Sequence, residues 1–188
     1  YELVATDAAL AAVCARVEKT PVLALDTEFV GENTFYPSLE LVQLFDGDGT
    51  VALIDAQAIG DWKPLARLLA QPSILKLLHS GSQDLSLLAR VTGEAPRPLF
   101  DTQLAAAMAG LGEQISYANL VREFVGVTLE KGETVSNWSQ RPLRDAQLEY
   151  AALDVLHLHQ VHKALHDRLV ALKRLDWFEE EQQARAAM

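Results

Sequence analysis

Two acidic residues, Asp26 and Glu28, follow an apolar run from Pro21 to Leu25. Successive side chains of a β-strand point to opposite faces, so acids spaced two residues apart would share one face. Two like charges at the end of a buried strand are costly unless a cation lies between them. Carboxylate oxygens suit hard divalent ions such as Mg²⁺ or Mn²⁺. The pair is therefore a candidate metal site, but D-x-E alone is a common pattern, and two solvated acids at a strand edge explain it equally simply.

A third acid, Asp84, lies where the chain passes from one expected element to the next. The apolar run from Ile74 to His79 is typical of a buried strand, and a helical pattern begins at Gln83. Functional sites in open α/β sheets gather at such junctions. An acid in the first turn of a helix can also serve only to complement the helix dipole.

A tyrosine and a fourth acid are four residues apart in a strongly helical segment. Tyr150 and Asp154 would lie on the same helix face, about one turn from each other. A hydrogen-bonded pair with a purely structural role is the alternative.

These residues need elements to position them. We expect strands at residues 22–28, 39–45, 50–55, 74–79 and 98–100, and helices at 7–19, 64–69, 83–90, 102–110, 117–125 and 144–172, with a last helix from Asp176. Residues 127–142 show no clear period and are expected to form a loop or a short irregular helix.

The order of these elements predicts the fold class. The runs 39–45 and 50–55 are joined by a short Asp/Gly turn, which predicts a hairpin and three antiparallel strands at the start. Strands alternating with helices then indicate a mixed α/β sheet with helices on its faces. This order resembles that of ribonuclease-H-like sheets.

The ordered motifs D-x-E, D and Y-x-x-x-D resemble those of the DEDD exonuclease superfamily in its tyrosine-containing branch, and most closely the ribonuclease D family. The likeness covers nearly the whole chain, because further phrases match that family: Tyr36-Pro37, Leu41-Val42-Gln43-Leu44, Leu53-Ile54-Asp55, Phe100-Asp101-Thr102-Gln103, Gly126-Val127-Thr128-Leu129, Lys131, Trp138 and Arg141-Pro142-Leu143.

The resemblance implies a metal-dependent 3′-to-5′ exonuclease. Two Mg²⁺ or Mn²⁺ ions would be held by Asp26, Glu28, Asp84 and Asp154, and nucleoside 5′-monophosphates would be released from single-stranded RNA 3′ ends, including those of tRNA precursors. A free tyrosine with a pKa near 10 is only about one part in a thousand ionised at pH 7, so Tyr150 is expected to position the attacking water while the metals acidify it.

Contacts to the substrate are less sharply indicated. Candidates for stacking on bases or touching phosphate are Phe29, Gln43, His79, Lys131, Trp138 and Arg141, and each has a core or surface alternative. Asp101 belongs to a family-like phrase but could equally be a helix N-cap. His159, His162 and His166 form a helical stripe that we interpret as a solvated or partly packed face, not a zinc site.

Composition sets outer limits. With 188 residues the chain is expected to be one catalytic domain over residues 1–188, without the helical nucleic-acid-binding domains that commonly follow in the family. A net charge of −10 argues against extensive binding to duplexes, although divalent ions would reverse the local sign at an acidic cleft. One cysteine, no apolar run of about 18 residues and no leader pattern lead us to expect a cytoplasmic protein without a membrane anchor.

Two other functions fit the same fold. One is a DNA 3′-to-5′ exonuclease of the proofreading type, because contacts to the ribose 2′-hydroxyl cannot be read from the sequence. The other is a non-catalytic domain that binds nucleic acid or protein, which the retention of four acids and a tyrosine disfavours.

Overall fold

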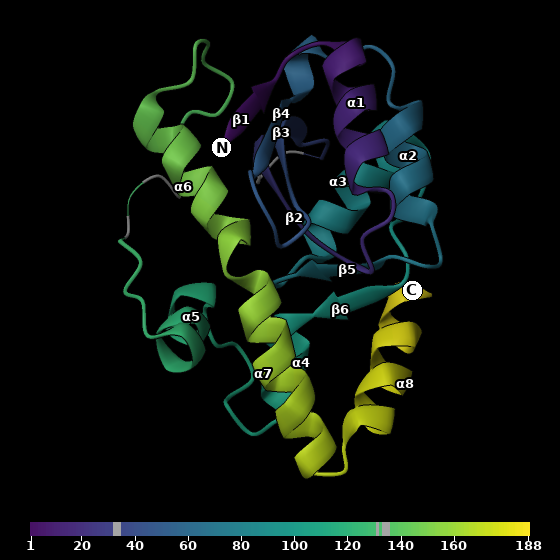
Figure 1. The fold of residues 1–188 in the computed structure, drawn as a ribbon, viewed down its shortest axis with the longest axis vertical. Helices are drawn as coiled ribbons and strands as arrows, with labels where there is room; N and C mark the ends of the chain where they lie inside the picture. Colours follow the sequence, from purple (N-terminus) through teal and green to yellow (C-terminus); the bar gives the residue numbers. More distant parts are fainter. Residues whose placement is uncertain (32–34, 131, 133–135) are drawn as a thin grey trace.

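The computed structural model describes residues 1–31, 35–130, 132 and 136–188, and Figure 1 shows their arrangement. The strands are β1 (Glu2–Val4), β2 (Val22–Val30), β3 (Ser38–Phe45), β4 (Ala52–Asp55), β5 (Leu75–Leu78) and β6 (Leu99–Asp101). The helices are α1 (Asp7–Val17), α2 (Lys63–Ala70), α3 (Ser82–Thr92), α4 (Thr102–Met108), α5 (Tyr117–Val125), α6 (Asp145–Leu156), α7 (Leu158–Ala171) and α8 (Leu175–Ala186), with a 3₁₀ turn at Ala56–Ala58.

The six strands form one mixed sheet in the order β1-β4-β3-β2-β5-β6. Strand β3 is antiparallel to both β2 and β4, whereas the other neighbouring pairs are parallel. The predicted mixed α/β sheet is therefore confirmed. Strand β2 is central, and it is the strand that carries Asp26 and Glu28.

Each face of the sheet has its own hydrophobic core. Leu23 and Leu25 of β2 pack with residues of α1, α2 and α3 on one face. Ala24 belongs to the core on the other face, together with residues of α4 to α8. Figure 1 shows these two groups of helices on opposite sides of the strands. Alternation along β2 therefore places Asp26 and Glu28 on the face that α6 covers.

Local signals place most helix ends where they were predicted. The Ser116 hydroxyl accepts a hydrogen bond from the Asn119 amide at 3.1 Å, and α5 ends at Gly126 with a left-handed φ of 77°. Residues 127–142 form no helix over their described part.

The predicted single helix over residues 144–172 is wrong, because the chain forms two helices, α6 and α7, that meet at His157 (Figure 1). The backbone of His157 has φ −105° and ψ 0°, outside the helical range. The Tyr117 side chain causes the break, because its hydroxyl lies between the Leu153 carbonyl and the His157 amide. A side chain inserted into the helical hydrogen-bond ladder is a known cause of a kink.

Strand β1 was not predicted. Its three residues are too few to show a periodic pattern, and they become a strand only by pairing with β4, Leu3 opposite Leu53. Among the helices of the described chain, none combines the length and apolar character needed to cross a membrane.

Candidate active site

Strand β2 presents the first two acids at its carboxyl-terminal half. Asp26 lies opposite Gln43 and Glu28 opposite Leu41 of β3, and the register shifts by one residue directly after Glu28. Strand β5 pairs with β2 only from Val22 to Ala24 among the described pairings. The stretch that carries the acids therefore extends past the end of β5, and α3 begins on that side.

The turn between β5 and α3 places Asp84. A Cβ atom on Gly81 would lie only 2.4 Å from Cδ1 of the buried Leu78, so glycine lets the turn approach the strand. The Ser80 and Gly81 amides donate to the Asp101 carboxylate at 3.0 and 3.1 Å. Asp84 is buried in the first turn of α3, and its carboxylate accepts a hydrogen bond from the Thr27 hydroxyl. That bond joins the beginning of α3 to the residue between Asp26 and Glu28.

Helix α6 brings Asp154 to the same place. One carboxylate oxygen from each of Asp26, Glu28 and Asp154 lies within 4.8 Å of the others. Tyr150, one turn earlier on α6, is half-buried, and its ring lies 6.2 Å from that of Trp138. Two segments far apart in the sequence thus bring three of the predicted acids together, and the Thr27 hydrogen bond joins Asp84 to the same strand.

Burial is the leading cause that raises the pKa of all four acids, and neighbouring carboxylates add to this effect at Asp26 and Glu28. Burial, together with the charges of Asp84, Asp154 and Glu28, raises the pKa of Asp26 well above its ordinary range. Burial and the Asp154 carboxylate raise the pKa of Glu28 to about 9, and burial raises the pKa of Asp154 to about 7. Burial also raises the pKa of Asp84. A cation would remove this penalty, and converging carboxylate oxygens suit a hard divalent ion.

Comparisons with known proteins identify the family of this chain. A family model described as 3′-5′ exonuclease matches residues 1–170. The chain belongs to the 3′-5′ exonuclease family. The resemblance to ribonuclease D predicted from the motifs is confirmed as well. The chain is 50% identical to Escherichia coli ribonuclease D, in a match that covers 84% of this chain and 42% of that protein. It is 45% identical to Shewanella ribonuclease D, in a match that covers 96% of this chain and 46% of that protein.

Solved structures give the same relationship. The Escherichia coli ribonuclease D structure matches all of this chain and 51% of its own, with 44% identity and a TM-score of 0.94. Brucella melitensis NrnC bound to pGG matches with 32% identity and a TM-score of 0.84, covering 91% of this chain and 84% of NrnC. This 3′-5′ exonuclease chain therefore spans about half the length of the curated ribonuclease D relatives that it matches.

Several of the predicted substrate contacts of this exonuclease chain are buried in the structure. Gln43 is fully buried, and its amide donates to Glu28 at 3.3 Å. Trp138 is 1% exposed and packs beside Tyr150. Neither side chain is exposed to a nucleic acid in this structure, so both predictions are corrected. Gln43 instead hydrogen-bonds Glu28, and Trp138 packs against the ring of Tyr150. Phe29 is half-buried at the end of β2, and Lys131 lies outside the described residues.

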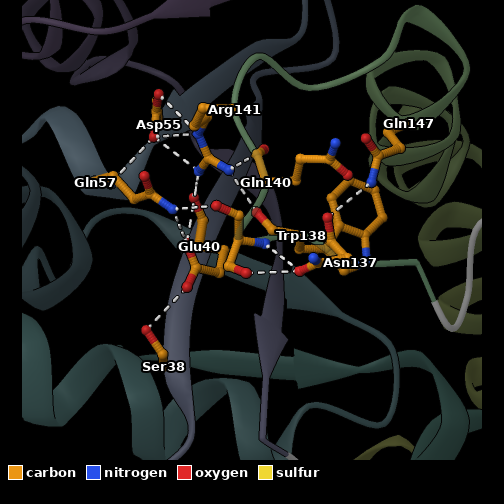
Figure 2. A network of polar contacts seen from close by, with 10 residues as sticks. Ser38, Glu40, Asp55, Gln57, Asn137, Trp138, Gln140, Arg141 and Gln147 are labelled. Atoms are coloured by element: carbon orange, nitrogen blue, oxygen red, sulfur yellow. Dashed lines mark hydrogen bonds and ion pairs between the residues drawn. The ribbon is translucent and has the colours of Figure 1, made fainter.

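Arg141 and His79 also point to internal partners. The Arg141 guanidinium bonds Asp55 through Nε (3.2 Å) and Nη2 (2.9 Å), and its other donors reach carbonyls of Glu40, Trp138 and Gln140, as Figure 2 shows. All five N–H groups are thus engaged, so the prediction of a phosphate contact is corrected to a structural tie. The two nitrogens of His79 contact the Thr102 hydroxyl and the Ile115 carbonyl at 2.8 and 2.9 Å.

Sequence reasoning missed Thr27 and Tyr117, and it left the role of Asp101 open. Asp101 caps α4 through the Gln103 amide at 2.9 Å and also holds the turn before Asp84. No local pattern marks Thr27 or Tyr117, because their partners are 57 and 36 residues away.

The histidine stripe on α7 is partly packed, as predicted. His159 donates from Nε2 to the Val22 carbonyl at 3.0 Å, and the His162 ring stands edge-on to Phe100 at 4.5 Å.

Proposed function

We propose that this chain is the catalytic domain of an exoribonuclease that removes nucleoside 5′-monophosphates from the 3′ end of single-stranded RNA, using two Mg²⁺ or Mn²⁺ ions. The convergence of Asp26, Glu28 and Asp154, with Asp84 tied to the same strand through Thr27, carries the proposal. Such a cluster is expensive to bury without cations and has no evident purpose in an inert scaffold.

The ions, when bound, supply acidity for a water molecule and neutralise charge on the phosphate. Asp26, Glu28, Asp84 and Asp154 hold them, and Gln43 orients Glu28 through its amide. Tyr150 hydrogen-bonds the attacking water, a role suited to its place one turn before Asp154. Trp138 packs against the Tyr150 ring and restricts its orientation.

RNA is the favoured substrate because of the relatives. The chain is 50% identical to Escherichia coli ribonuclease D, and a related structure is that of NrnC bound to pGG. From the same likeness we propose trimming of the 3′ ends of tRNA precursors and other stable RNAs in the cytoplasm. We further propose that residues 1–188 act as one catalytic domain.

The test uses 5′-labelled single-stranded RNA with Mg²⁺, with Mn²⁺ and with chelator. We expect stepwise shortening from the 3′ end, release of nucleoside 5′-monophosphates and loss of activity in chelator. Asp26→Asn should abolish release, and Tyr150→Phe should lower kcat by about 100-fold while RNA binding persists. Asp48→Asn removes an exposed acid from the β3–β4 turn and should change nothing.

A matched DNA strand and a tRNA precursor with extra 3′ nucleotides complete the experiment. Degradation of DNA in preference to RNA would replace the proposal with a DNA exonuclease. Failure to shorten any of these substrates with either metal would leave a non-catalytic domain.

A further inference from the structure

The junction of α6 and α7 contains a hydrogen-bond arrangement that a continuous helix would not need. In an α-helix the His157 amide would donate to the Leu153 carbonyl. Here the Tyr117 hydroxyl donates to that carbonyl at 2.7 Å, and the His157 amide donates to the Tyr117 oxygen at 3.2 Å. A side chain from α5 therefore replaces one rung of the helical ladder.

The hydrogen bonds of the Tyr117 hydroxyl lie beside a candidate metal ligand. Leu153, whose carbonyl Tyr117 bonds, directly precedes Asp154, whose carboxylate lies within 4.8 Å of those of Asp26 and Glu28. Burial, with smaller contributions from Asp154 and Asp26, raises the pKa of Tyr117 above its ordinary value. Its hydroxyl therefore stays protonated and can donate to the Leu153 carbonyl across the working pH range.

His79 and Gln103 contact the segment that carries Tyr117. The Ile115 carbonyl, two residues before Tyr117, accepts from His79 Nε2 at 2.9 Å and from Gln103 at 3.3 Å. The His79 ring also lies 6.1 Å from the Tyr117 ring. Since His79 directly follows β5, five residues before Asp84, these contacts connect the segment that carries Asp84 with the end of the helix that carries Asp154.

We propose that Tyr117 is a positioning residue of the active site, whose hydroxyl fixes the end of α6 and thereby sets Asp154 against Asp26 and Glu28 for metal binding. The proposal rests on the function proposed above. Removing the hydroxyl leaves the Leu153 carbonyl without this donor and the His157 amide with only the Val155 carbonyl, or it lets α6 and α7 close into one helix. We expect either change to shift the end of α6, which carries Asp154.

The experiment compares Tyr117→Phe with Ile74→Val, a small deletion in the core on the opposite face of the sheet. Both variants should lose some stability, which melting curves quantify. Mn²⁺ affinity is measured by calorimetric titration without RNA, and kcat and KM are measured separately on single-stranded RNA.

We expect Tyr117→Phe to weaken Mn²⁺ binding by about 10-fold and to lower kcat similarly, as removal of a group that orients a metal ligand does, with KM for RNA unchanged. His79→Asn should shift both quantities in the same direction, because it loosens the support of Tyr117. Ile74→Val should leave metal affinity and kcat at wild-type values.

Two results would overturn the proposal in distinguishable ways. If wild type binds Mn²⁺ and degrades RNA while Tyr117→Phe does both equally well, Tyr117 only packs α5 against α6, and the proposed function stands. If wild type neither binds Mn²⁺ nor degrades RNA, the proposed function fails, and the positioning role fails with it.

Discussion

Four carboxylates, those of Asp26, Glu28, Asp84 and Asp154, make up the candidate active site at the residue scale. All four have raised pKa values, and burial is the leading cause in each case. Without a bound cation the folded chain therefore retains protons that the unfolded chain would release. This protonation makes the stability of the metal-free protein depend on pH.

The sign of that dependence follows from linkage. The pKa of Glu28 rises from 4.5 to about 9, and that of Asp154 from 3.8 to about 7. Between about pH 4 and 9 the native state binds more protons than the unfolded state, so the free energy of unfolding falls as pH rises. We expect the melting temperature in chelator to drop from pH 5 to pH 8, and Mg²⁺ or Mn²⁺ to restore it at pH 8.

Glu28→Gln provides the control for this pH dependence. It keeps the shape of the side chain and removes one titrating group, so its melting temperature in chelator should fall less between pH 5 and pH 8. An equal fall in wild type and Glu28→Gln would show that the pH dependence arises elsewhere in the chain.

At the scale of elements, the segment before α6 is fixed to the sheet by Arg141. Its guanidinium bonds Asp55 of β4, lies 3.7 Å from the Glu40 carboxylate of β3, and bonds the Glu40 carbonyl (Figure 2). The same segment is joined to α6, because Gln147 donates to the Asn137 carbonyl at 3.3 Å. This network fixes the amino-terminal end of α6, as Tyr117 fixes its carboxyl-terminal end.

We predict that Arg141→Lys lowers the free energy of unfolding by about 2 kcal/mol. A lysine cannot reproduce the forked contacts of the guanidinium, so it leaves Asp55 and Glu40 poorly paired. Breaking a fully buried ion pair costs ~3–5 kcal/mol, and we expect a smaller loss here because Arg141 keeps some solvent contact. Urea unfolding measures it. Arg97→Lys alters an exposed pair with Glu94 (3.5 Å) and should change stability by less than about 0.5 kcal/mol. Equal effects of the two variants would contradict a special role for Arg141.

At the scale of the whole molecule, the proposed activity on RNA requires a chain with a net charge of −10 to bind a polyanion. Stacking of bases on aromatic side chains can bind RNA without requiring a positively charged surface. Phe35 and Tyr36 are 88% and 71% exposed, and the Arg90 guanidinium lies 5.6 Å from the Tyr36 ring. A cavity of about 430 Å³ beside them is lined by residues of α3, including Ser82 and Gln83 next to Asp84.

We therefore predict that Phe35→Ala raises KM for single-stranded RNA by about 10-fold with little change in kcat, since one stacked base contributes about 1–3 kcal/mol. Steady-state kinetics on an oligonucleotide gives both constants. Trp177→Ala removes another exposed aromatic side chain, on α8, and should leave KM unchanged. A KM for Phe35→Ala within twofold of wild type would exclude stacking at this position.

The sequence by itself determined the elements with local signals. The period of β2 placed Asp26 and Glu28 on one face, Ser116 and Gly126 bounded α5, and the apolar run before His79 predicted β5. These features depend on residues a few positions apart, and the helix or strand that they form is the same in most surroundings.

Only the tertiary structure decided features that depend on distant partners. The hydroxyl of Tyr117 divides a segment whose own composition favours one continuous helix, and pairing with β4 turns Glu2–Val4 into a strand. The burial of Gln43 and Trp138, which sequence reasoning assigned to the substrate, follows from the way α6 covers β2 and β3. A residue's partner across the core is set by packing of the whole chain, and no local period records it.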